Sequence, residues 1–334
     1  MRLENVVAVT GGRLLNNPSI SRFESVALTP KKVSRGSLFV TGNPEEIEEA
    51  LRNGAYGIVT DKKVSPTDDE VAWIEVENLS DTLVKLLRLW LVINPRRFVQ
   101  VSPQVMEFMR MTACGRNALL LPEDRMKAGE TILASSAEQT LFSDNRTLLE
   151  HMGTETFHLK PDIPAFTPVA DLIFESSFIL DGVFHERVPL PPCMQPIFLE
   201  AVGLLAASGA DYTLSHLGHT PSFEPVFVDS RLNAMEPGST EQVLIFADSA
   251  IPNRCYEELA RIKWTNCKLF TPTQIKFRCD IKMEISSYAR ISDLLEMLET
   301  PLKPGYYLIV GLRSDTFFRE SGTSAKKFET KGLF

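Results

Sequence analysis

The sequence lacks the glycine-rich, lysine-bearing turn that holds a nucleoside triphosphate in many ATP-using proteins. In such a turn, glycines let backbone N–H groups face the phosphates, and a lysine reaches the terminal ones. The 334-residue chain contains no Gly-Lys dipeptide. At a strand-to-helix junction over residues 98–111 it carries Ser102-Pro103, which is typical of a helix cap followed by proline at the first helical position. We therefore expect this junction to start a helix but not to bind a phosphate.

Cysteines are few, and none of them belongs to a Cys-x-x-Cys pair. An odd number of widely spaced cysteines favours reduced thiols over disulfide bonds or a zinc site. The five are Cys114, Cys193, Cys255, Cys267 and Cys279. His216 and His219 also make a poor zinc site, because no cysteine pair or acid accompanies them. We therefore expect no metal site, and we expect both histidines to lie at the surface.

Long apolar runs and an excess of basic residues are absent as well. The longest apolar stretches, 83–93 and 198–210, are interrupted by charges and are too short to span a bilayer. The first residues show no basic segment followed by an apolar run, so a cytoplasmic location is expected. With 35 basic and 43 acidic side chains, the formal net charge is −8. This balance argues against a nucleic-acid partner.

The chain does contain an alternation of short β-rich and helical segments, which predicts an α/β protein. In the first part we expect strands at 37–41, 56–60 and 71–76 and helices at 44–53 and 79–91, the latter capped by Ser80. The second helix should end at Asn94, because a residue before proline disfavours helical dihedrals. We therefore place the end of a first domain, 1–94, at this position.

The remaining chain divides into a second region, 95–228, and a third, 229–334. In the second region, strands are expected at 117–121 and 131–135 and a helix near 145–152. There Asp181-Gly182 predicts a hairpin between strands 170–180 and 183–188. In the third region, strands at 242–246, 268–270 and 306–310 alternate with helices at 252–261 and 291–300. That alternation predicts a small doubly wound parallel sheet.

Six segments also stand in a recognisable order: Lys32–Val40, Ala50–Val59, Asn94-Pro95, Val188–Pro192, Leu244–Ser249 and Gly305–Arg313. In this order they resemble the Mur ligases of peptidoglycan synthesis, closest to the type that adds D-alanyl-D-alanine to a UDP-N-acetylmuramoyl-tripeptide. The resemblance covers nearly the whole chain at low identity. It implies a three-domain architecture: an N-terminal uridine-binding-like domain, a shortened central ATPase-like parallel-sheet domain without a P-loop, and a small C-terminal Rossmann-like domain.

The chain differs from the family pattern at the motifs that bind substrate and phosphate in the family. Thr29-Pro30-Lys31 stands in place of Asp-Ser-Arg, Met194-Gln195 in place of His-Asn, and Ser102–Met106 in place of the phosphate loop. The family activates a carboxylate with ATP, and this needs magnesium and positive groups. We therefore expect no cofactor and no catalytic residue. The expected role is binding or scaffolding in peptidoglycan synthesis, with a UDP-muramoyl peptide or a cell-wall synthesis protein as partner.

Two alternatives stay open. The first is a divergent active ligase that joins an amino acid or dipeptide to a UDP-N-acetylmuramoyl-peptide, using ATP and Mg²⁺ through groups that the motifs do not reveal. The second is an unrelated multidomain α/β protein. The loop at Ser102–Met106 is the feature that distinguishes the first alternative from a ligase without activity.

The candidate ligand contacts fall in two groups. Ser37, Leu38 and Phe39 belong to the uridine-domain signature, and Lys31 could meet a diphosphate. Asp248 and Ser249 follow one strand of the doubly wound sheet and Arg313 follows another, where ligands of such sheets collect. Each candidate also has a structural explanation. Ser37, Leu38 and Phe39 could simply form a buried strand, and Lys31 could be a solvated surface lysine. Asp248 and Ser249 could cap the next helix, and Arg313 could cap a helix end or form an ion pair with Asp315.

Overall fold

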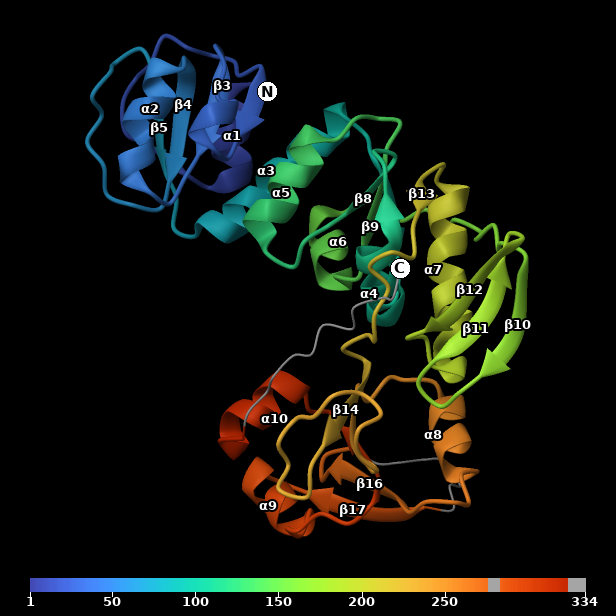
Figure 1. The fold of residues 1–334 in the computed structure, drawn as a ribbon. Coiled ribbons are helices and arrows are strands. Elements are labelled where there is room, and N and C mark those ends of the chain that lie inside the picture. The colour runs from blue at the N-terminus through green and yellow to red at the C-terminus, as the bar shows by residue number, and fades with distance from the viewer. Residues whose placement is uncertain (276–282, 324–334) are drawn as a thin grey trace. The chain divides into compact units, whose positions relative to one another are not determined.

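The computed structural model describes residues 1–275 and 283–323, and its contacts group the chain into two compact units (Figure 1). The first unit contains Met1–Ser102, Cys114–Lys160 and Ala207–Ala210. The second contains Pro103–Ala113, Pro161–Ala206 and the described residues from Asp211 onward. The architecture is α/β with several parallel sheets, as the sequence predicts. The division into three domains at residues 94 and 228 stays a prediction.

The first unit begins with a five-stranded sheet in the order β1-β5-β4-β3-β2. Strands β2 to β5 are parallel to their neighbours, and β1 is antiparallel to β5. Ile58 and Val59 on β4 are both fully buried, as expected for a strand covered on both faces. The elements are α1 (Leu3–Thr10), β1 (Arg13–Leu14), β2 (Ser25–Ala27), η1 (Pro30–Lys32), β3 (Ser37–Val40), η2 (Pro44–Glu46), α2 (Ile47–Arg52), β4 (Ala55–Thr60) and β5 (Ala72–Glu75).

Helix α3 (Leu79–Ile93) joins this sheet to a second one. Its cap is Asn78, whose Oδ1 accepts a hydrogen bond from the Asp81 N–H at 3.0 Å, and not the predicted Ser80. The second sheet is three-stranded and parallel, in the order β6-β9-β8. Its elements are β6 (Arg97–Gln100), β8 (Ala118–Leu120), α5 (Arg125–Ala134), β9 (Thr140–Ser143) and α6 (Arg146–Met152). The resemblance implies a parallel sheet in the central region, and this sheet is parallel.

The strand predicted at residues 131–135 is wrong, because this segment forms the end of helix α5. Asp124 caps the helix by accepting a hydrogen bond from the Lys127 N–H at 2.9 Å. Ala128 and Ile132, one helical turn apart, are the buried side chains. A short β-branched segment is therefore helical here, since its place on the buried helix face outweighs its strand propensity.

In the second unit, α4 (Pro103–Thr112) is followed in the chain by an antiparallel sheet of β10 (Phe166–Asp171), β11 (Ser176–Leu180) and β12 (Val183–Val188). The predicted hairpin is confirmed: Asp181 and Gly182 have φ angles of +48° and +83°, as a two-residue primed turn requires. The segment predicted as one strand over 170–180 is instead split between β10 and β11. The other elements here are η3 (Pro192–Met194), α7 (Gln195–Ala207) and β13 (Asp211–Tyr212), and β7 (Ala113–Cys114) has one residue in each unit.

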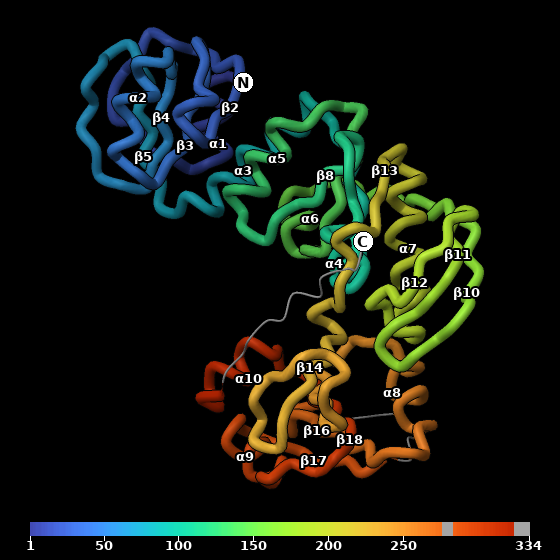
Figure 2. The backbone as a smooth tube through the Cα atoms, in the orientation of Figure 1, coloured from blue at the N-terminus to red at the C-terminus, as the bar shows by residue number. Residues whose placement is uncertain are grey.

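The C-terminal sheet has the order β14-β15-β18-β16-β17, with β14 antiparallel and the rest parallel. Helices α9 and α10 lie on one side of it and α8 on the other (Figures 1 and 2). Leu294 of α9 and Phe317 of α10 are fully buried in one core with Phe246 of β15. The doubly wound prediction is thus confirmed. The elements are β14 (Phe223–Val228), β15 (Gln242–Ala247), α8 (Asn253–Ala260), β16 (Cys267–Pro272), β17 (Glu284–Tyr288), α9 (Ile291–Met297), β18 (Gly305–Val310) and α10 (Ser314–Ser321).

Candidate functional site

A cavity of about 400 Å³ opens at the carboxyl ends of strands β15, β18 and β16. Ligands of doubly wound sheets bind at this edge, because the loops that follow parallel strands meet there. Gly311, with a φ angle of +75°, carries the chain past the ring of Pro272, whose Cγ would lie 3.0 Å from an added Cβ. The lining residues are Glu107, Pro221, Ser222, Ala247, Asp248, Ser249, Pro272, Gln274, Ile275, Gly311, Leu312 and Arg313. We call this space the C-terminal pocket.

Glu107 supplies the most buried charge of the C-terminal pocket. Its Oε2 accepts a hydrogen bond from the Ser222 N–H at 3.1 Å. Burial raises the pKa of Glu107 and the nearby charge of Asp248 adds to the rise, while the bond from Ser222 and the charge of Arg313 oppose it. A carboxyl group with a raised pKa is easier to protonate, so Glu107 can serve as an acceptor or a donor toward a ligand.

Asp248 and Ser249 follow β15 directly and are both exposed at the pocket. The Asp248 Oδ1 accepts a hydrogen bond from the Ala250 N–H at 2.8 Å, so this carboxylate orders the turn after the strand. Neither side chain caps α8, whose N-cap position is Pro252 and shows no side-chain hydrogen bond. The capping alternative therefore does not account for these two residues.

Arg313 is the positive group of the pocket. It is exposed and occupies the N-cap position of α10, where its backbone carbonyl accepts a hydrogen bond from the Phe317 N–H at 3.0 Å. Within the described residues, no ion pair joins its side chain to Asp315, the partner considered from the sequence. Two carboxylates and one guanidinium give the pocket a mixed character that suits a small polar ligand held by charge-assisted hydrogen bonds.

The ligand contacts predicted in the N-terminal region do not line the C-terminal pocket. Ser37, Leu38 and Phe39 are fully buried in β3. The Ser37 hydroxyl lies 2.8 Å from the Ser25 Oγ and accepts a hydrogen bond from the Ser34 N–H at 2.9 Å. Lys31 is exposed on η1. The structure thus gathers Asp248, Ser249 and Arg313 at one pocket, and it places three of the other four candidates in the hydrophobic interior.

At the start of α4, Ser102 and Pro103 are exposed and the residues that follow them are buried. Gln104, Val105 and Met106 are 5%, 1% and 0% exposed, and Pro103 at the first helical position has no N–H to offer. Glu107, one residue later, is the site residue that the sequence analysis missed. No sequence signal links it to Ser222, which is 115 positions away in the chain.

The histidine pair is only partly as predicted. His216 is exposed, whereas the Nδ1 of His219 is buried and has no hydrogen-bond partner among the described residues. Burial lowers the pKa of His219 to about 4. His219 is only partly exposed, so the surface position expected for it is met in part. No group of three or more His, Cys, Asp or Glu side chains in the described part of the chain is arranged to hold a metal ion.

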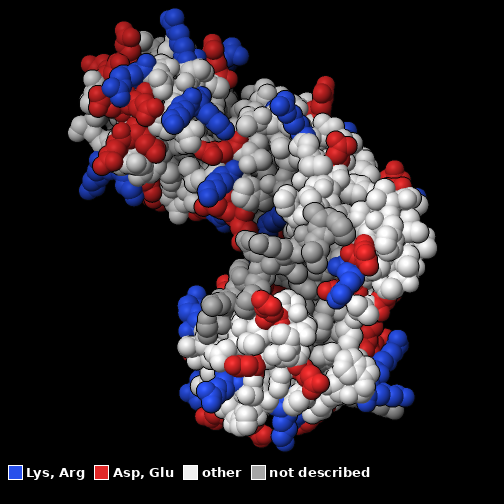
Figure 3. Space-filling model, in the orientation of Figure 1, with Lys and Arg blue, Asp and Glu red and all other residues white. Residues whose placement is uncertain are grey.

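Surface charge and helix length bear on the expected partners. On the face drawn in Figure 3, acidic and basic side chains are interspersed over the N-terminal part of the chain, with no broad basic patch there. In residues 1–275 and 283–323, no helix combines the length and apolar character needed to cross a membrane. Neither observation identifies a ligand or a second candidate site.

The comparisons with known proteins give likenesses of structure only. No protein-family model matches the sequence, and no curated protein sequence matches it. A MurF ligase from Thermotoga maritima, solved in complex with ADP, is similar over 90% of this chain and 98% of its own, with 15% identity and a TM-score of 0.44. MurF from Acinetobacter baumannii is similar over 96% and 97% of the two chains, with 9% identity and a TM-score of 0.47. The UDP-N-acetylmuramate-alanine ligase MurC from Thermotoga maritima is similar over 86% and 92%, with 12% identity and a TM-score of 0.33.

Proposed function

We propose that this chain is a Mur-ligase-like protein that has lost ATP-dependent ligation and acts as a binding component of peptidoglycan precursor synthesis. Its ligand in this proposal is a UDP-muramoyl peptide, bound with the help of the C-terminal pocket. A cell-wall synthesis protein is the partner if no small ligand binds. The proposal depends on the six ordered segments and on the residues at the start of α4.

The observation that carries the proposal is the start of α4. A triphosphate needs free backbone N–H groups and a lysine at this point, whereas Pro103 has no N–H and the next residues, Gln104, Val105 and Met106, are buried and include neither glycine nor lysine. Charge-assisted hydrogen bonds contribute roughly 1.5–3 kcal/mol each. Losing about three of them weakens triphosphate binding on the order of a thousandfold or more.

The C-terminal pocket supports a retained binding role. Arg313 offers a guanidinium suited to a carboxylate or phosphate, and Asp248 and Glu107 offer acceptors for an amine or hydroxyl. A peptide linked to a nucleotide sugar presents all of these groups. The second candidate function, a divergent active ligase, is favoured by the same polar groups, because they could also orient an acceptor amine.

Calorimetric titration separates the two candidates. We expect the purified protein to bind a UDP-muramoyl tripeptide, to show no heat with magnesium-ATP at 0.1 mM (roughly the middle of the ordinary substrate range), and to release no ADP. Micromolar binding of magnesium-ATP, or ADP release with a dipeptide acceptor, would reject the loss of ligation. Binding of neither ligand would leave a protein partner as the proposed role.

Substitution at the pocket tests where the ligand binds. Arg313→Ala should weaken binding of the UDP-muramoyl peptide by about tenfold, since a charge-assisted hydrogen bond of about 1.5 kcal/mol or more is lost. The matched control is Arg319→Ala, because Arg319 is exposed on the same helix α10 and does not line the pocket. Equal affinities of the two variants in the same titration would place the ligand elsewhere.

A further inference from the structure

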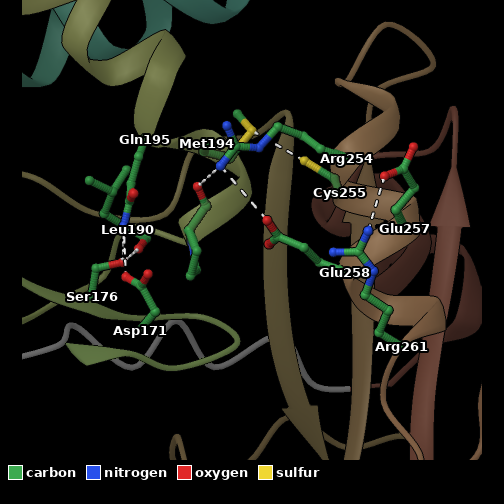
Figure 4. Close-up of polar contacts among 11 residues, drawn as sticks. Asp171, Ser176, Leu190, Met194, Gln195, Arg254, Cys255, Glu257, Glu258 and Arg261 are labelled. Atoms are coloured by element: carbon green, nitrogen blue, oxygen red, sulfur yellow. Dashed lines mark hydrogen bonds and ion pairs between the residues drawn. The ribbon is translucent and has the colours of Figure 1, made fainter. Parts of the chain in front are cut away.

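Three sulfur-bearing side chains lie close together near a second cavity, whose lining residues differ from those of the C-terminal pocket. Cys193 and Met194 belong to η3, and Cys255 belongs to α8. Their exposed fractions are 2%, 0% and 0%. The Cys255 Sγ lies 3.8 Å from the Met194 Sδ (Figure 4), and the neighbouring Cys255 raises the pKa of the Cys193 thiol. Two chain segments about sixty positions apart therefore bring three sulfur atoms together.

We propose that Cys193, Met194 and Cys255 form a binding site for one soft monovalent metal ion, of which Cu(I) is the biological example. Thiolate and thioether ligands together select such an ion, whereas Zn²⁺, Mg²⁺ and Ca²⁺ prefer other donor sets. Sulfur ligands about 2.3 Å from a single ion stand about 4 Å apart in a trigonal arrangement. The observed 3.8 Å separation of Cys255 Sγ and Met194 Sδ meets that requirement.

One positive and one negative side chain lie next to the sulfur cluster. Binding releases two thiol protons, and the complex of Cu⁺ with two thiolates carries one negative charge. The guanidinium of Arg254 lies beside the site, where its Nη2 donates a hydrogen bond to the Pro192 carbonyl and stands 3.7 Å from the Glu258 Oε1 (Figure 4). The positive charge of Arg254 favours the anionic complex, whereas the carboxylate of Glu258 opposes it.

A route for the ion is present. A cavity of about 300 Å³ is lined by Cys193 and Cys255, and Asp171 and Glu258 lie in its wall. Carboxylates at the wall attract cations from solution. Cys193 and Cys255 belong to the lining of the cavity, and Met194 does not. The donor set excludes a harder ion, since in the described part of the chain no third His, Cys, Asp or Glu joins the two cysteines in a metal-binding group.

Anaerobic titration with Cu(I), supplied as its acetonitrile complex against a chromogenic Cu(I) chelator, tests the site. The starting protein carries serine at Cys114, Cys267 and Cys279, so that only the two cysteines of the cluster remain. We expect one Cu(I) per chain and three sulfur neighbours by X-ray absorption. Cys193→Ala should weaken binding by at least about tenfold. An unchanged affinity in Cys193→Ala, or no binding against the chelator, would overturn the proposal.

Met194→Leu keeps the volume of the buried side chain and removes only its sulfur, so the fold should be retained. Thermal unfolding of each variant is measured alongside to verify this. We expect the sulfur count to fall from three to two and the affinity to fall by about tenfold. The matched control is Met297→Leu, at a partly exposed methionine on α9, which should leave both values unchanged. Three sulfur neighbours persisting in Met194→Leu would show that the ion sits elsewhere.

Discussion

At the scale of single residues, His219 combines a partly exposed side chain with a buried ring nitrogen. Its Nδ1 is buried without a hydrogen-bond partner in the described residues, and burial lowers its pKa from 6.5 to about 4. Burial therefore favours the neutral imidazole of His219 over the imidazolium in the folded protein. The unfolded chain binds the proton at a higher pH than the folded one does, so acidification favours unfolding.

The predicted consequence is a loss of stability as the pH falls from about 6.5 toward 4, with no contribution from this group above about 6.5. The whole effect amounts to about 3 kcal/mol at most. In His219→Gln the difference between the free energies of unfolding at pH 7.5 and pH 5, measured with urea, should shrink. His216→Gln, at an exposed histidine, should keep the wild-type difference. An identical pH dependence in both variants would contradict the assignment to His219.

At the scale of elements, the hairpin β11–β12 depends on a turn that only certain residues adopt. Gly182 has a φ angle of +83°, and an added Cβ would meet nothing within 4 Å. Gly182→Ala is therefore a test of backbone strain alone, with an expected loss of about 1–2 kcal/mol in the free energy of unfolding. Gly218→Ala is the matched control, because that site is equally open and has no positive φ. Equal stabilities of the two variants would mean that the turn relaxes freely.

The elements that the sequence predicted well are those with local signals. Asp181-Gly182 specifies its turn by backbone conformation alone, and the strands ending at Ala247 and Val310 are long apolar runs. The segment 131–135 was mistaken for a strand because its helical character depends on the cap at Asp124 and on burial against other elements. Asp248, Ser249 and Arg313 could be predicted as a group from strand ends. Glu107 could not, because its contact with Ser222 joins residues far apart in the chain.

At the scale of the whole molecule, the first unit has one continuous core that does not stop at Asn94. Leu83 and Leu87 of α3 are buried in the same cluster as Val59 of the first sheet and Leu141 of the second. Helix α5 lies close to α3 at Gly129, because an added Cβ there would lie 3.1 Å from both Leu28 Cδ1 and Leu83 Cδ2. The helix that the sequence analysis took as the end of a domain therefore contributes side chains to the interior on both sides of the proposed boundary.

This core predicts that a change at Gly129 weakens both sheets together. Gly129→Val adds bulk between α5 and α3 and should cost about 1–3 kcal/mol, and native-state hydrogen exchange should show protection falling equally in β3–β4 and in β6–β9. Lys127→Val introduces the same residue on the exposed face of α5 and should have little effect on either sheet. A loss of protection confined to residues 95–160 would instead support an independent domain ending at residue 94, because a separately folded N-terminal sheet would not sense strain placed beyond it.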